Sequence, residues 1–369
     1  MRVVPVIRMA GLLSVCCALA THALDLPWMK PTTQPAGTPP AAPAGGAATD
    51  LASRAAAGEA EAQNLLGEAC RDGLQGQNKD AGAAFGWFKA AAQQGHLGGQ
   101  INLARCYYNG LGTQQDRVEA ARWLRKAAEQ GNPQAQYTLA NRLRKGEGVA
   151  KDPTEAVAWL RKAAAQGLAD AQINLGFCSE TGEGTPVDLA EAFAWYLKAA
   201  EQNHAVAQCN VGNAYTSGGG VAADLPAAFQ WYSRSAANGY AKAMNNVGRC
   251  YQSGQGIAPD LALAAQWYRK AAEAGNMYGM YNLGVLLETG RGIPADAAQA
   301  LAWYQKAAQA GYQGAAAAVA RLTSPPAAAT PAKAPPAATP QETPEQKSAV
   351  VEVIELIEAV HNAVKKEPK

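Results

Sequence analysis

Tryptophan recurs in this sequence at a constant spacing of 36 residues. Seven of the eight tryptophans keep that spacing: Trp87, Trp123, Trp159, Trp195, Trp231, Trp267 and Trp303. Internal repetition with a period of roughly 20 to 50 residues is typical of solenoids, in which one small unit stacks on copies of itself. We call a set of residues that recurs at this spacing a column. The Trp column predicts seven stacked units.

Two further columns run in step with the tryptophans and describe the unit. An aspartate comes before an Ala-rich run, which predicts a helix N-cap, because the carboxylate accepts the unpaired N–H groups of the first turn. Glu119, Glu155 and Glu191 follow three residues after such a cap, so we also expect capping boxes. We therefore interpret the Asp column as structural, not as acid–base or metal chemistry. The columns are Asp80, Asp116, Asp152, Asp188, Asp224, Asp260 and Asp296, and Ala84, Ala120, Ala156, Ala192, Ala228, Ala264 and Ala300.

Each unit is predicted to contain a first helix, A, a Gly-x-Gly turn, and a second helix, B, that carries the Trp. Paired glycines after a helix suit a left-handed C-cap and a tight reversal. No Gly-Lys-Ser or Gly-Lys-Thr follows any pair, which argues against a phosphate-binding loop. The pairs are Gly110 and Gly112, Gly146 and Gly148, Gly182 and Gly184, Gly218 and Gly220, Gly254 and Gly256, and Gly290 and Gly292.

Helix A carries an apolar stripe at three- and four-residue spacing, exemplified by Gln100, Leu103, Ala104 and Tyr107. The small residue at 104 recurs as glycine and would let neighbouring helices approach closely. Its counterparts are Gly176, Gly212, Gly248 and Gly284. One helix pair alone buries too little surface, whereas stacked pairs share a continuous core.

The composition favours an all-α protein and excludes some classes of partner. Alanine dominates and runs of alternating β-branched residues are missing. The chain is 17% charged with a net charge of +2, which gives no electrostatic reason to expect nucleic acid.

The two ends of the chain differ from the repeats. Residues 1–23 have a basic start and a short apolar run, which predicts a secretory signal, and residues 24–49 form a Pro/Ala/Gly-rich linker. Cys16 and Cys17 leave lipid anchoring as an alternative. The repeats are expected at 50–322, a second linker at 323–342, and an amphipathic helix at 343–369.

Residues for catalysis or metal binding are missing. The sequence contains no His-Glu-x-x-His, Gly-x-Ser-x-Gly, Ser-x-x-Lys or Cys-x-x-Cys, so we expect no enzyme activity, no metal and no cofactor. His96 and His204 fall at equivalent turns three repeats apart and cannot serve one centre. Five cysteines follow the signal, and we expect buried thiols, with a disulfide between Cys70 and Cys106 left open.

Taken together, the columns resemble the Sel1-like repeat, a relative of the tetratricopeptide repeat. The order Ala-Gln-x-Asn-Leu-Gly, Gly-x-Gly, Asp, Ala-x-x-Trp-Tyr, Ala-Ala is matched almost position for position by residues 169–203. The resemblance covers residues 58–322 as seven repeats and a closing half-repeat. The first repeat departs from the pattern, with an extra residue in its loop at 74–79 and no Gly-x-Gly pair. The resemblance to the Sel1-like repeat implies a right-handed α-solenoid that binds other proteins, often as an adaptor or regulator in bacterial envelopes or at host contact.

If helix A lines the binding groove, as the resemblance implies, the residues opposite its buried stripe are the candidates for binding. They form a row of Asn with scattered Arg and aromatic residues, which suits an extended peptide because Asn both donates and accepts hydrogen bonds. Alternatively, the Asn residues bridge adjacent repeats and meet no ligand. The candidates are Asn102, Arg105, Tyr108, Tyr137, Asn141, Arg144, Asn174, Phe177, Asn210, Asn213, Asn246, Arg249, Tyr281 and Asn282.

The resulting hypothesis is an exported, non-enzymatic scaffold, periplasmic or secreted, that binds a protein or peptide segment. A cell-wall glycan binder and a hydrolase or β-lactam-binding protein are the alternatives. The C-terminal helix is expected to dock on itself, on the solenoid or on a partner. A basic column on helix B is interpreted as a solvated face, not as an anion track: Lys126, Lys162, Lys198, Arg234, Lys270 and Lys306.

Overall fold

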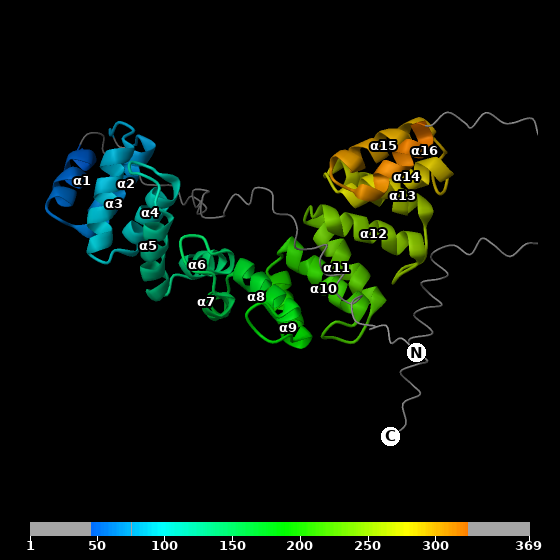
Figure 1. Ribbon diagram of the computed structural model, residues 1–369, viewed down its shortest axis with the longest axis horizontal. Coiled ribbons are helices and arrows are strands. Elements are labelled where there is room, and N and C mark those ends of the chain that lie inside the picture. The colour runs from blue at the N-terminus through cyan, green and yellow to red at the C-terminus, as the bar shows by residue number, and fades with distance from the viewer. Residues whose placement is uncertain (1–45, 75, 324–369) are drawn as a thin grey trace, which may run out of the picture. The chain divides into compact units, whose positions relative to one another are not determined.

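The computed structural model describes residues 46–74 and 76–323, and within those ranges it contains sixteen α-helices and no strand (Figure 1). The predicted all-α class is therefore confirmed. The signal sequence predicted at 1–23 and the C-terminal helix predicted at 343–369 lie outside the described residues, as does all but the first residue of the linker predicted at 323–342.

The helices alternate as the sequence predicts, with one A helix and one B helix in each of seven repeats. The A helices are α2 (Ala60–Asp72), α4 (Leu97–Asn109), α6 (Pro133–Lys145), α8 (Ala169–Thr181), α10 (Ala205–Ser217), α12 (Ala241–Ser253) and α14 (Met277–Thr289). The B helices are α3 (Ala81–Gln93), α5 (Arg117–Glu129), α7 (Pro153–Ala165), α9 (Leu189–Glu201), α11 (Leu225–Ala237), α13 (Leu261–Glu273) and α15 (Ala297–Gln309). The closing half-repeat is α16 (Gln313–Thr323), in the place of an eighth A helix.

One further helix, α1 (Gly46–Ala56), precedes the first repeat and begins inside the segment 24–49 that the sequence assigned to a linker. Leu51 and Ala55 are buried in one cluster with Leu66 of α2. Gln63 donates a hydrogen bond to the Ala55 carbonyl at 3.2 Å, as Gln136 does to the Ala128 carbonyl at 3.1 Å. Helix α1 thus occupies the position that a B helix takes before every later repeat.

The Asp column caps all seven B helices, as predicted. The side chain of Asp152, for example, accepts a hydrogen bond from the Glu155 N–H at 2.8 Å. The second half of the predicted capping box is wrong, because the Asp152 N–H donates to the Leu143 carbonyl of the preceding A helix at 2.9 Å. Glu155 instead pairs with Arg125 and accepts from the indole N–H of Trp159 at 3.0 Å. The cap therefore also ties each B helix to its own A helix.

The Gly-x-Gly turns carry a second contact, between repeats. Gly110 has a φ of 69° and forms the left-handed C-cap of α4, as expected. Gly112 has a φ of 67°, and a Cβ built there would lie 1.9 Å from the Ala81 carbonyl oxygen of the preceding B helix. Only glycine fits this position, because both the backbone conformation and the space exclude a side chain.

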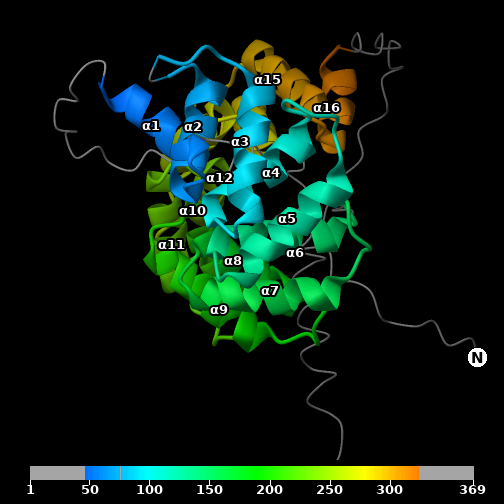
Figure 2. The same cartoon turned by 90° about the vertical axis from the view of Figure 1, so that its left-hand side faces the viewer.

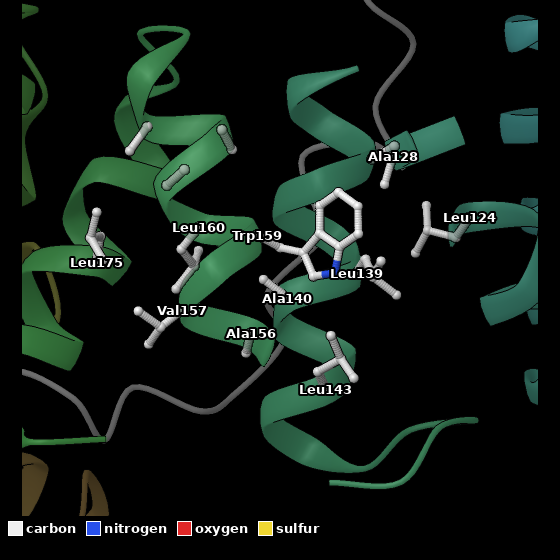
Figure 3. Packing of buried hydrophobic residues seen from close by; sticks show 14 of the residues in the cluster. Leu124, Ala128, Leu139, Ala140, Leu143, Ala156, Val157, Trp159, Leu160 and Leu175 are labelled. Atoms are coloured by element: carbon white, nitrogen blue, oxygen red, sulfur yellow. The ribbon is translucent and has the colours of Figure 1, made fainter. Parts of the chain in front are cut away.

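From α1 to α15, each helix packs against the one that follows it in the chain, and α1 to α4 can be followed side by side in Figure 2. The core between them combines small and aliphatic side chains with buried aromatic rings such as Phe88, Tyr232 and Tyr268. Trp159 of α7 points toward α6, where Leu139 and Ala140 lie (Figure 3), and only 8% of its surface is exposed. Stacked repeats therefore share one continuous core, as the sequence predicts for a solenoid.

The small residue of each A helix is matched to the side chain that faces it from the B helix. A Cβ on Gly212 would lie 2.6 Å from the ring of Tyr232, and Gly176, Gly248 and Gly284 face Tyr196, Tyr268 and Tyr304 in the same way. Where the B helix carries leucine instead, the A helix carries alanine. These pairs, Ala104 with Leu124 and Ala140 with Leu160, belong to one buried cluster.

This matching predicts the effect of a single added methyl group. Gly212→Ala should lower stability by about 1–3 kcal/mol, because the new Cβ overlaps the Tyr232 ring. Adding Tyr232→Leu should recover part of that loss, because Ala with Leu is the pair found in the second and third repeats. Urea unfolding of the two single variants and the double variant would measure the coupling.

Gly86→Ala is the matched control, because Gly86 lies inside α3 with nothing within 4 Å of its added Cβ. That change should leave stability unchanged or raise it slightly. The matching of Gly212 with Tyr232 would be contradicted if Gly86→Ala and Gly212→Ala changed stability equally. It would also be contradicted if the effects of Gly212→Ala and Tyr232→Leu on stability were strictly additive.

Candidate functional site: the A-helix face

We call the surface formed by the candidate residues of the A helices the A-helix face. Arg249 is exposed, whereas Asn102 is buried, with 6% of its surface exposed. The remaining candidates are half-buried, which leaves part of each side chain accessible: Arg105, Tyr108, Tyr137, Asn141, Arg144, Asn174, Phe177, Asn210, Asn213, Asn246, Tyr281 and Asn282.

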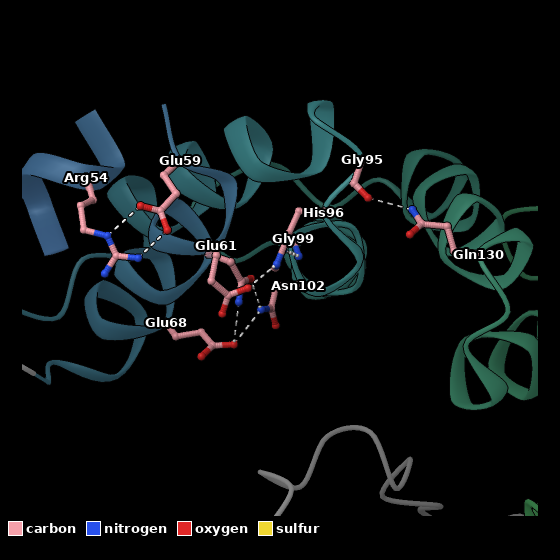
Figure 4. Close-up of polar contacts among 10 residues, drawn as sticks. Arg54, Glu59, Glu61, Glu68, Gly95, His96, Gly99, Asn102 and Gln130 are labelled. Atoms are coloured by element: carbon pink, nitrogen blue, oxygen red, sulfur yellow. Dashed lines mark hydrogen bonds and ion pairs between the residues drawn. The ribbon is translucent and has the colours of Figure 1, made fainter. Parts of the chain in front are cut away.

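Several of the asparagines bridge neighbouring A helices. Asn102 donates to Asn64 at 2.9 Å and to Glu68 at 3.1 Å, both on α2 (Figure 4). Asn174 of α8 donates to Asn141 of α6 at 3.0 Å. Further along, Asn282 donates to Asn245 at 2.9 Å. These amides act as links between repeats, which is the alternative that the sequence left open beside ligand binding.

Two more asparagines make contacts of a different kind. Asn246 donates to the Cys209 sulfur on the preceding A helix at 3.6 Å. Asn213 accepts a hydrogen bond from the Tyr232 hydroxyl of its own repeat at 2.8 Å. The Asn row is therefore tied into the framework at several points.

Arg144 and Phe177 lie next to each other on α6 and α8. Arg144 donates to the two carboxylate oxygens of Glu183 at 3.1 and 2.6 Å, and its guanidinium lies 5.5 Å from the Phe177 ring centre. Tyr137 also lies on α6, and burial raises the pKa of its hydroxyl. These three candidates are brought together at the α6–α8 interface.

A second group gathers around Tyr108 of α4. The Arg142 guanidinium of α6 lies 4.0 Å from the Tyr108 ring centre, and that of Arg117 lies 5.7 Å away. Arg142, which the sequence did not single out, is buried to 4% exposure in a column otherwise made of small or apolar residues. Burial lowers the pKa of Arg142, and it also lowers that of Arg105.

The last repeat carries a cluster of tyrosines on α14, on α15 and in the turn before α16. The Tyr281 ring centre lies 4.8 Å from that of Tyr312 and 5.3 Å from that of Tyr304. Tyr278 contacts Tyr312 edge-on at 5.3 Å. The sequence analysis named only Tyr281 as a candidate, because Tyr278 and Tyr312 fall outside the positions counted from the buried stripe.

The sequence analysis also missed a buried column of glutamines, which joins successive repeats below the A-helix face. Gln172 donates to the Ala164 carbonyl at 3.1 Å and accepts from Gln202 at 2.8 Å. The same side-chain pairs occur between Gln130 and Gln100, Gln166 and Gln136, and Asn238 and Gln208. In the sixth repeat, Met244 replaces the glutamine, and Ala274 stands where its partner would be. This paired change from polar to apolar is the sequence signal that could have identified the column.

The basic column of helix B lies on an exposed face, as the sequence predicted, and each cation makes a contact there that the sequence analysis did not identify. Each cation lies over the Trp three residues earlier, for example Lys126 at 4.0 Å from the Trp123 ring and Arg234 at 4.6 Å from the Trp231 ring. Cations over indole faces stabilise the helix surface. The Trp and basic columns are therefore both engaged in contacts within the repeat.

The histidines and cysteines are structural in the described residues. His96 and His204 precede α4 and α10 as N-cap residues, and His96 pairs with Glu61 at 2.7 Å (Figure 4). Cys70 and Cys106 are buried and form no disulfide, nor does any other cysteine within residues 46–74 and 76–323. Nor do these ranges contain a cluster of three or more His, Cys, Asp or Glu residues suited to a metal ion.

The alternating helix pairs, the glycine turns and the stacked core define a tetratricopeptide-like α-solenoid. Within that class, the model of the Sel1 repeat matches residues 60–96, 98–132, 133–168, 169–204, 205–240, 241–276 and 278–312. The chain belongs to the Sel1 repeat family. Proteins of this family are generally protein-interaction scaffolds and typically non-catalytic, and they are often extracellular or periplasmic.

Solved structures agree with this assignment. The chain is similar to c5321, a protective antigen of uropathogenic Escherichia coli strains that displays an SLR fold, with 34% identity and a TM-score of 0.69 over 74% of this chain. It spans 59% of that protein's length. A Sel1 repeat protein from Oxalobacter formigenes shows 32% identity and a TM-score of 0.65 over 74% of this chain and 79% of its own. A search of curated protein sequences returns no significant match.

A helix must be about 20 residues long and predominantly apolar to cross a bilayer. None of the helices described between Gly46 and Thr323 meets both requirements.

The buried cysteines give a test of the core. Burial raises the pKa of Cys106, Cys178 and Cys250 to about 11. At pH 8 each is then ionised in about one molecule in a thousand, against roughly a quarter for an exposed thiol. In a chain starting at Leu24, iodoacetamide should label these thiols very slowly until guanidinium unfolds the protein.

Mass spectrometry counts the labels that each chain carries. After unfolding without a reductant, all five cysteines should carry a label. Rapid labelling of the folded chain would contradict the buried core, and uptake of only three labels after unfolding would reveal a disulfide.

Proposed function

We propose that this protein is a non-enzymatic scaffold that binds an extended segment of another protein along the A-helix face. The observation that carries the proposal is a row of accessible positions whose side chain changes from repeat to repeat. The row consists of Arg105, Asn141, Phe177, Asn213, Arg249 and Val285, which are half-buried or exposed. The framework columns around it repeat the same residue types.

This contrast suits recognition of a partner. The aspartate N-caps of the B helices, the glycine turns from the second repeat on and most of the glutamine column recur unchanged, so they cannot distinguish one partner from another. A row in which cationic, aromatic and amide side chains follow one another can distinguish partners, because each repeat offers a different contact to the segment lying across it.

The proposed place of action is the bacterial envelope or the outside of the cell. Residues 1–23 have the basic start and the apolar run of a secretory signal. Members of the Sel1 repeat family are often extracellular or periplasmic, which agrees with that segment. A regulatory or adaptor role in this compartment follows the family's general use in protein interactions.

Crosslinking and pulldown from cell envelopes would test the proposal with the chain from Leu24 to Lys369. Phe177→Ala and Arg249→Glu should each lower capture of the partner about fivefold or more, because aromatic and arginine anchors often contribute over about 1 kcal/mol each. Arg269→Glu is the matched control, since Arg269 is also exposed but lies on B helix α13.

Two comparisons make the result decisive. Equal loss of capture with Arg249→Glu and Arg269→Glu would mean that charge alone drives binding, and it would contradict recognition by the A-helix face. A chain ending at Thr323 separates the solenoid from the C-terminal segment. Capture that disappears with this truncation would place recognition in the segment instead.

A further inference from the structure

The tyrosine cluster of the last repeat forms an aromatic surface that the repeat itself does not require. Tyr281 belongs to the A-helix face, Tyr278 lies one turn earlier on α14, and Tyr312 lies in the turn before α16. All three side chains are half-buried, so part of each ring is accessible. Earlier repeats form the same fold with other residues at these positions. The column of Tyr312, for example, reads His96, Asn132, Leu168, His204, Tyr240 and Asn276.

A buried tyrosine holds this surface in place. Tyr304 faces Gly284, where a Cβ would lie 2.7 Å from its ring, and only 1% of its surface is exposed. Its hydroxyl donates to Glu288 at 2.8 Å, and Arg321 donates to the same carboxylate oxygen at 2.7 Å. The Tyr281 ring packs on Tyr304, with the ring centres 5.3 Å apart. The surface is therefore ordered before a partner arrives, which lowers the entropic cost of binding.

Tyr312 completes the cluster and adds a hydroxyl donor. Its ring lies over Gly314, where a Cβ would approach the Cε1 atom of Tyr312 to 2.9 Å, and it contacts both Tyr278 and Tyr281. The hydroxyl groups of Tyr281 and Tyr312 form no hydrogen bond with any residue that the structure describes. Burial raises the pKa of Tyr312, so its hydroxyl stays protonated and able to donate at neutral pH. The cluster thus combines uncharged ring faces with two hydroxyl donors.

The arrangement of the rings limits what can bind. A cage for a quaternary ammonium group needs room for the cation within about 6 Å of each ring centre. Here the rings of Tyr281 and Tyr312 touch each other, with their centres 4.8 Å apart, so no cation fits between them. Their planes are also tilted by 56° from each other, so the two rings do not form one flat platform for a sugar. The surface instead offers small apolar faces at different angles.

A proline-rich segment matches such a surface. In the polyproline II conformation the backbone carbonyls have no internal hydrogen bonds, and the proline rings project from a helix with three residues per turn. Aromatic surfaces bind such segments because the ligand conformation is already formed and little entropy is lost. A run of prolines is also uncharged, as the cluster is. Ring faces and hydroxyl donors therefore both find counterparts on the ligand.

We propose that the tyrosine cluster binds a proline-rich stretch of the partner segment. Proline rings pack on the accessible faces of Tyr278, Tyr281 and Tyr312, and backbone carbonyls accept hydrogen bonds from the hydroxyl groups of Tyr281 and Tyr312. The inference rests on the proposed function, since Tyr281 belongs to the A-helix face. It adds the class of sequence that the partner presents to the last repeat.

Acetyl-nonaproline-amide at pH 7 is the probe of this site. In the chain from Leu24 to Lys369 with ¹³C-labelled tyrosine, it should shift the ring signals of Tyr278, Tyr281 and Tyr312 in a saturable way, observed by ¹H–¹³C NMR. Single Tyr→Phe variants assign these signals. A neutral peptide of glycine and serine of the same length is the control ligand and should produce no saturable shift. Absence of a saturable shift with the proline peptide would overturn the proposal.

Tyr312→Ala removes one ring and should weaken binding of the proline peptide about fivefold or more. Tyr312→Phe keeps the ring but removes the hydroxyl donor, so the fold is preserved and the expected loss is smaller, about threefold. Tyr240→Ala is the matched control, because Tyr240 is half-buried at the same position two repeats earlier, outside the cluster. Equal loss in Tyr312→Ala and Tyr240→Ala, or no loss in either Tyr312 variant, would contradict the assignment.

Two comparisons separate a partner protein from other occupants. Residues 324–342 of this chain are themselves rich in proline. Tighter binding of the proline peptide to a chain ending at Thr323 than to the full chain would show that this segment competes for the surface, and it would overturn the assignment to a partner. Triacetylchitotriose is the sugar probe. If it shifts the three rings at lower concentration than the proline peptide does, the ligand is a glycan and the proposal is wrong.

The outcome for the proline site is distinguishable from that for the scaffold function. Partner capture that depends on Phe177 and Arg249 but not on Tyr312 would leave the scaffold function intact and reject the proline site. Saturable binding of the proline peptide, together with partner capture that is unaffected by Phe177→Ala and Arg249→Glu, would support the site and contradict recognition along the A-helix face.

Discussion

The turn between the two helices of each repeat is the constraint on which the rest of the structure depends. Its last residue, the capping aspartate, accepts hydrogen bonds from the first turn of the B helix and donates its own N–H to the A helix, as Asp152 does to Leu143 at 2.9 Å. Its second glycine packs directly on the preceding B helix. One short segment therefore fixes the helix pair and its distance from the previous pair.

Part of the variation in the framework built on this turn occurs in matched pairs. Glycine faces tyrosine where alanine faces leucine, and the glutamine column becomes Met244 where its partner becomes Ala274. Such paired changes keep the volume and the hydrogen bonds of each interface balanced, since a half-satisfied polar pair costs more than an apolar one. The accessible row from Arg105 to Val285 varies without such matching, and that difference separates it from the paired columns of the scaffold.

The sequence predicted the fold more completely than the site. The helices, their caps and the glycine turns follow from local preferences that a 36-residue period repeats seven times. The sequence left open whether Asn102, Asn174 and Asn282 bind a ligand or bridge repeats, and the structure shows a hydrogen bond from each to the preceding A helix. Glu155 was expected to close a capping box and instead pairs with Arg125 of the neighbouring repeat, because that N–H is already bonded to the A helix.

The sequence by itself therefore determined the caps and turns that separate the helices of the repeats, that the helices pair and stack, and that the family is Sel1. These features depend on contacts within a few residues and on periodicity. Only the tertiary structure decided that α1 covers the first repeat, that Lys126 lies on Trp123, and that the rings of Tyr281 and Tyr312 meet in the last repeat. Apart from Lys126 on Trp123, these contacts join separate elements, so they depend on the register in which one element lies on the next.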